Sequence, residues 1–68
     1  MKIYIVLHDV DWSNWEIQTV KDSLEKAKQY VDNKFWHVEK WTKDGNTLSE
    51  DLGEGFGPRI KIEEWEVQ

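Results

Sequence analysis

Cysteine is absent from this chain of 68 residues, so no disulfide can hold its fold together. This absence agrees with a reducing compartment. Long hydrophobic runs are absent too: no stretch approaches the roughly 18 apolar residues of a membrane span, and the apolar run at residues 3–7 is too short for a signal peptide. We therefore expect a soluble cytoplasmic protein that does not associate with a membrane.

Positive charge is scarce in the last third of the chain. Residues 1–43 carry seven acidic and seven basic side chains, whereas residues 44–68 carry seven acidic side chains against Arg59 and Lys61. The net charge of −5 therefore comes from this last segment. Because proteins bind nucleic acid mainly by neutralising phosphates with Lys and Arg, we expect no direct nucleic-acid binding. The expected partner is a host or bacterial protein with a basic or neutral surface.

The length allows one domain, residues 1–68, with a small core, because a chain of this size buries only about 60% of its unfolded surface. Leu, Ile, Val and Phe number 17 of 68, which is above the level typical of disordered chains. The five tryptophans can each remove about 150–250 Å² from water. We expect them to serve the core or an interface, with one or two of them partly exposed.

Residues 22–31 form the one segment with a sustained helical period. Asp22 or Ser23 can cap its first turn, and Asp22 with Glu25 has the spacing of a capping box. A helix this short needs a sheet to cover its apolar face. That face consists of Leu24, Ala27, Tyr30, Val31 and Phe35.

Strand-like sequence lies on both sides of this helix. Residues 2–8 and 15–20 precede it, and residues 36–41 and 59–67 follow it. Apolar residues at both parities of residues 2–8 indicate a central strand, and the Asp44-Gly45 pair favours a tight reversal. We predict an α+β fold of order β-β-α-β-β, with one helix on a mostly antiparallel four-stranded sheet.

Residues 47–58 are the least regular part of the chain and predict a long acidic loop. Its run of alternating glycines precedes a strand, lacks the Lys and Ser/Thr of a phosphate-binding loop, and carries Glu54 where phosphate would sit. Phe56 in this loop either packs into the core, the outcome we favour, or meets a partner.

The apolar positions of residues 59–67 change parity, from Ile60 and Ile62 to Trp65 and Val67. A change of parity moves side chains to the other face of a strand. We therefore predict a bulge near residues 63–64, or a strand that covers two surfaces at once.

Three segments together resemble a small uncharacterised family of bacterial and phage proteins. They are the opening residues 1–8, the Ser-x-Glu-Lys-Ala-x-x-Tyr-Val pattern at residues 23–31 with Leu24 at the variable place, and the closing Ile-x-Glu-Trp-Glu-Val at residues 62–67. The resemblance implies an origin in bacteria or their viruses. It implies no catalytic residue, because the family has no established activity.

No pattern in the chain predicts catalysis, a cofactor or a metal. Asp9, Asp11 and Ser13 open like a calcium loop, but the later Gly and Glu of such a loop are missing. His8 and His37 lie at predicted strand positions without the spacing of metal ligands, and we expect them to be structural.

These observations predict a small acidic, non-catalytic protein-interaction module. In a sharper form of this hypothesis, its carboxylates imitate phosphates and inhibit a nucleic-acid-handling or defence protein. The alternative is a structural or accessory homodimer whose exposed strand edge pairs with a second copy. The predicted partner-binding residues are Trp12, Glu50, Asp51, Glu54, Phe56, Glu63, Glu64 and Glu66.

Overall fold

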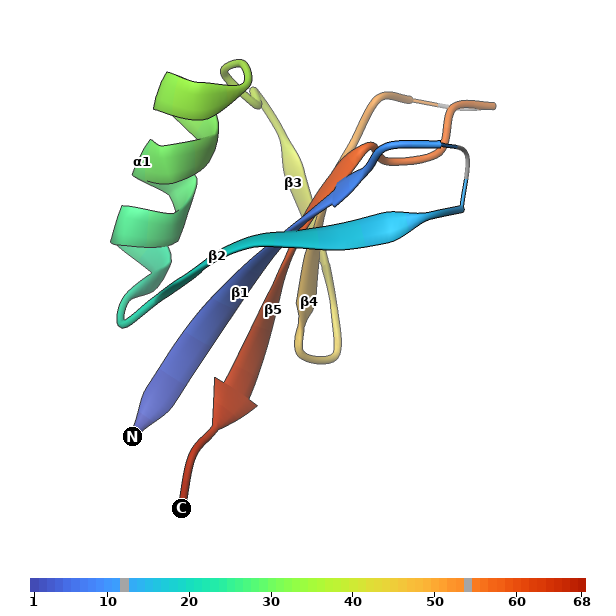
Figure 1. Ribbon diagram of the computed structural model, residues 1–68. Helices are drawn as coiled ribbons and strands as arrows, with labels where there is room; N and C mark the ends of the chain where they lie inside the picture. Colours follow the sequence, from blue (N-terminus) through green and yellow to red (C-terminus); the bar gives the residue numbers. More distant parts are fainter. Residues whose placement is uncertain (12, 54) are drawn as a thin grey trace.

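A computed structural model describes residues 1–11, 13–53 and 55–68. In these residues one helix packs on a five-stranded antiparallel sheet, which is an α+β fold (Figure 1). The elements are β1 (Lys2–Asp9), β2 (Trp15–Lys21), α1 (Leu24–Lys34), β3 (Trp41–Asp44), β4 (Thr47–Glu50) and β5 (Ile60–Glu66).

The strands lie in the order β2-β1-β5-β4-β3, so the two edges of the sheet are β2 and β3. β1 pairs with both β2 and β5, which confirms the central position predicted for residues 2–8. The helix α1 lies on one face, against β1 and β2 (Figure 1).

The predicted α+β class is confirmed, but the sheet has five strands and not four. Residues 36–40 were predicted as strand and form none, while residues 47–50 of the predicted loop form β4. The reversal predicted at Asp44-Gly45 is confirmed: Asp44 pairs with Thr47, and Gly45 has a φ of +64°, which suits the primed turns of hairpins.

The helix begins where the sequence indicates, but its cap differs in detail. Ser23 is the N-cap, and its hydroxyl oxygen accepts the backbone N–H of Lys26 at 3.2 Å. Lys26 therefore occupies the place of the acidic residue in a capping box. Asp22 instead forms an ion pair with the Lys26 ammonium at 2.9 Å.

The core lies between α1 and the helix-facing side of the sheet. Val6 on β1 is opposite Ile62 on β5, and both are essentially inaccessible to solvent. The helix contributes the stripe predicted from its spacing, with Ala27 and Val31 buried. Residues 36–40 run beside this core, because Val38 is buried in it.

The predicted bulge near residues 63–64 is absent: β5 stays in register with β1 from Lys2 opposite Glu66 to His8 opposite Ile60. The change of parity instead reflects the two faces of the sheet, because Ile60 faces the helix and Trp65 faces away. The irregularity lies between β1 and β2, where the register shifts between Val6 and Leu7.

Candidate binding surface

The face of the sheet opposite α1 carries an apolar patch, which we call the open face. The register places Ile17 and Val20 of β2 beside Leu7 and Ile5 of β1, on the side that does not face the core. The apolar members of the open face are Ile3, Ile5, Leu7, Trp15, Ile17, Val20 and Trp65.

Three members of the open face are exposed to an unusual degree for apolar side chains in strands. Ile17 is 64% exposed, Val20 50% and Trp65 49%, whereas Leu7, between its neighbours, is 9% exposed. Ile17 and Val20 lie on β2 and Trp65 lies on β5, on either side of β1. The half-buried Ile3 and Ile5 of β1 lie between them and join these side chains into one patch.

The charges within this patch come as a pair of opposite sign on β5. The Lys61 ammonium lies 3.8 Å from the Glu63 carboxylate and 4.4 Å from the centre of the Trp15 ring. The indole N–H of Trp65 donates to the same Glu63 carboxylate at 3.1 Å. Lys61 and Glu63 thus add no net charge to the open face.

Towards β3 and β4 the same side of the sheet becomes polar. Thr42 of β3 is opposite Ser49 of β4, and the Thr42 hydroxyl donates to Asp51 at 3.2 Å. Asp51 also accepts the backbone N–H of Gly53 at 3.0 Å and lies 3.5 Å from the Lys40 ammonium. These contacts, the Gly53 bond foremost, lower the pKa of the Asp51 carboxyl.

The prediction that Glu50 presents its charge to a partner is wrong, because Glu50 is only 5% exposed. It lies at the end of β4 with its side chain on the side of the core. One carboxylate oxygen accepts the indole N–H of Trp36, and the other accepts the backbone N–H of Arg59 at 3.2 Å. A buried carboxylate with two such donors holds segments of the chain together.

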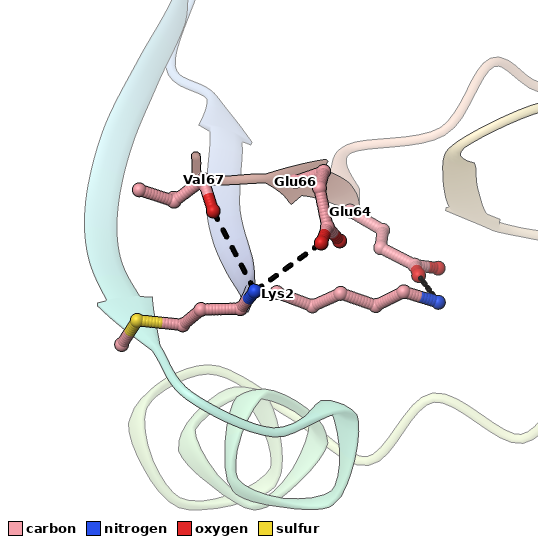
Figure 2. A network of polar contacts seen from close by, with 5 residues as sticks. Lys2, Glu64, Glu66 and Val67 are labelled. Atoms are coloured by element: carbon pink, nitrogen blue, oxygen red, sulfur yellow. Dashed lines mark hydrogen bonds and ion pairs between the residues drawn. The ribbon is translucent and has the colours of Figure 1, made fainter.

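The other described carboxylates of the predicted acidic surface do not gather on one face. Glu63 is on the open side of β5, whereas Glu64 and Glu66 have the opposite parity. Figure 2 shows Glu64 beside the Lys2 ammonium, 2.8 Å away, and Glu66 beside the terminal amino group of Met1, 3.2 Å away. The hydrogen bond from Lys2 lowers the pKa of the Glu64 carboxyl, and the same contact raises the pKa of Lys2.

Phe56 does not pack into the core, contrary to the outcome we favoured, since 70% of it is exposed. It borders a hollow of about 350 Å³ together with Leu52 and Arg59. Trp12 and Glu54, the other two predicted partner-binding residues, lie outside the described residues.

The expectation that one or two tryptophans stay partly exposed is confirmed by Trp36, at 40%, and Trp65, at 49%. The sequence analysis missed Ile17 and Val20 as surface residues. The sequence did give one indication of them, because apolar side chains occur at both odd and even positions of residues 15–20. Without the register shift opposite Val6 and Leu7, which brings Ile17 and Val20 to one face, that pattern does not identify a patch.

In the turn that resembles the start of a calcium loop, the first carboxylate has a structural role. The Asp9 side chain accepts the backbone N–H of Ser13 at 2.9 Å, of Asn14 at 3.1 Å and of Asp11 at 3.3 Å. These donors, Ser13 foremost, lower the pKa of Asp9.

The two histidines differ in their surroundings. The ring centres of His8 and Phe35 lie 4.7 Å apart, beside the core. His37 lies outside any strand, and its Nδ1 is 3.1 Å from the Asp32 carboxylate. The strand position predicted for His37 is therefore wrong.

Across residues 1–11, 13–53 and 55–68, no three His, Asp or Glu side chains come together as metal ligands would. In the same ranges, every buried side-chain nitrogen or oxygen has a hydrogen-bond partner. The one helix found there is too short and too polar to span a membrane. No protein-family model, curated protein or solved structure matches this chain.

Proposed function

We propose that this chain is a small, non-enzymatic protein-interaction module that docks onto another protein chain through the open face. The observation that carries the proposal is the shared exposure of Ile17, Val20 and Trp65 on one side of the sheet. Contiguous apolar surface of this kind marks interaction sites on small soluble domains. Tryptophan in particular is enriched among the residues that dominate binding energy.

The arrangement of charge supports an apolar mode of docking over imitation of nucleic acid. The described carboxylates of the last third are divided between two faces, and Glu63, Glu64 and Glu66 each lie beside a cation of the same chain. Inhibition of a nucleic-acid-handling or defence protein therefore rests on the net charge of −5 alone. Bacterial or phage origin rests on the sequence resemblance, and a cytoplasmic location on the composition.

The proposal is tested by capturing partners on the immobilised chain from a bacterial lysate that also contains the untagged chain, at about 50 and about 300 mM salt. Ile17→Lys places a charge in the open face, and Gln29→Lys makes the same charge change on the exposed side of α1. We expect Ile17→Lys to lose the captured protein and Gln29→Lys to retain it. Capture should persist at the higher salt, because apolar contact is not screened.

A different result would favour the acidic surface. In that case the captured protein would be lost at about 300 mM salt and with Glu66→Lys, while Ile17→Lys would retain it. Reversal of Glu50 is not a useful variant, because its carboxylate is buried and the change would test folding.

A further inference from the structure

We infer that the protein chain which covers the open face is a second copy of this chain, packed sheet against sheet about a two-fold axis. The inference rests on the proposed function and names its partner. Two antiparallel sheets that stack in this way lie about 10 Å apart and bury their facing side chains between them. Such a dimer gives Ile17, Val20 and Trp65 a second layer on the side away from α1.

The charges of the open face suit a copy of itself. A two-fold interface brings the same patch together from both chains, so a patch of one sign would repel itself. Here Lys61 and Glu63 lie two positions apart on one strand with about a quarter of each side chain exposed. A two-fold axis near them sets Lys61 of one copy opposite Glu63 of the other, and the rest of the patch is apolar.

The edges of the sheet suit a second copy less well than its face. At the β2 edge, the register shift opposite Val6 and Leu7 makes the strand irregular, and the Gln18 amide donates to the Glu16 carbonyl at 3.3 Å. Irregular strands resist pairing with another strand. The other edge, β3, spans four residues. We therefore place self-association on the face and not on the strand edge that the sequence analysis considered.

The size of the face limits the affinity that such a dimer can reach. A standard interface takes about 800 Å² from each partner, about a sixth of the 4851 Å² surface of this chain. The apolar part of the face lies on β2, β1 and β5, whose seven or eight residues make it about 25 Å long and about 10 Å wide between the outer two strands. Because this area is below the standard size, we expect a weak dimer that dissociates within the range of about 1 to about 500 µM.

Sedimentation equilibrium of the complete chain from about 1 to about 500 µM tests the inference. The mass should rise with concentration from 8.2 kDa towards twice that value. Ile17→Lys and, as a second variant, Val20→Lys should each weaken the dimer at least about tenfold, whereas Gln29→Lys should match the wild type. Both Lys variants replace exposed side chains on an edge strand, and circular dichroism checks that they fold.

The absence of cysteine allows a second, independent test by cross-linking of single introduced cysteines. Single variants Ile17→Cys, Val20→Cys and Trp65→Cys probe the face, Gln18→Cys probes the β2 edge, and Gln29→Cys probes the helix. At least one face variant should form a covalent dimer with a bismaleimide cross-linker that spans about 10 Å, because facing positions of stacked sheets lie about that far apart and too far for a direct disulfide. The helix variant should form none at the same concentration.

Two outcomes would overturn the inference. One is a mass of 8.2 kDa at every concentration. If the chain were such a monomer and Ile17→Lys still lost a captured protein, the proposed function would stand with a different partner. The other is a dimer that survives Ile17→Lys and Val20→Lys and is trapped by Gln18→Cys, which would assign self-association to the edge. If, in that case, a captured protein were also unaffected by Ile17→Lys, the proposed function would be wrong as well.

Discussion

At the scale of single residues, Arg59 links the buried carboxylate of Glu50 to the backbone of Asp9, which is also buried, and so holds one end of the sheet together. Asp9 is 7% exposed and Glu50 5%. The Arg59 backbone N–H donates to Glu50, while its guanidinium donates to the Asp9 carbonyl at 3.1 and 3.2 Å. These bonds join the end of β1 to the end of β4 and to the start of β5.

Glu50→Ala should lower the free energy of unfolding by about 2–3 kcal/mol, because it leaves the Trp36 indole N–H and the Arg59 backbone N–H without their acceptor. Glu50→Gln should cost less, since its amide oxygen can still accept one of these bonds. Urea unfolding followed by tryptophan fluorescence measures both. Glu66→Ala, at an exposed carboxylate, is the control and should change stability by less than about 0.5 kcal/mol. Equal losses for Glu50→Ala and Glu66→Ala would contradict the assigned role.

Asp9 should make the stability of the fold depend on pH. Three backbone N–H groups donate to its carboxylate, so its pKa in the folded chain lies below that in the unfolded chain. Its contribution is therefore complete above the unfolded value of about 3.9 and is lost as the pH falls through the lower folded value. Asp9→Asn should be less stable than the wild type at pH 7, and the difference should shrink towards pH 2.

Urea midpoints at several pH values measure this difference. Asp11→Asn changes an exposed carboxylate in the same turn and should follow the wild type throughout. A gap between Asp9→Asn and the wild type that stays constant from pH 7 to pH 2 would show that the charge of Asp9 is not what the turn requires.

At the scale of elements, the helix N-terminus depends on one hydroxyl. Ser23→Ala removes the acceptor of the Lys26 backbone N–H and should destabilise the fold by about 1 kcal/mol. Ser23→Asp keeps an acceptor and should remain close to the wild type. Thermal unfolding by circular dichroism compares the two. A matched loss in both variants would mean that Ser23 acts through something other than the cap.

The elements that local sequence could predict are those with a strong period or a strong turn. The helix stripe around Ala27 and Val31, the central strand and the Asp44-Gly45 reversal all follow from spacing. β4 could not be predicted in this way, because Leu48 is its one apolar side chain and its other inward residue is Glu50. A charged residue at an inward position hides the alternation of a strand.

The candidate surface was predicted less well than the fold, for a related reason. Burial of Glu50 depends on donors 14 and nine residues away along the chain, which no local pattern reveals. The open face depends on the shift in register that brings Ile17 and Val20 to one side. Both features are properties of strand pairing and not of any single segment.

At the scale of the whole molecule, the two halves of the sheet are not equally supported. β1 and β5 stay in register from Lys2 to His8, and α1 packs against β1 and β2 on one face of the sheet (Figure 1). The β3–β4 hairpin joins β5 through β4, whose register covers Thr47 to Ser49. Leu48 and Trp41 are the hydrophobic side chains of this hairpin that pack against the core.

Native-state hydrogen exchange should therefore divide the sheet in two. Amides of β1 and β5 should exchange with the free energy of global unfolding, whereas amides shared by β3 and β4 should exchange through a local opening of lower free energy. Gly45→Ala, at a φ of +64°, should strain the hairpin turn and speed exchange in β3 and β4 alone. Gly57→Ala is the matched control, because its φ is not positive and no atom lies near its Cβ position. If Gly45→Ala sped exchange in β1 as much as in β3, the hairpin would be part of one cooperative unit with the core, and the smaller half of the sheet would not open by itself.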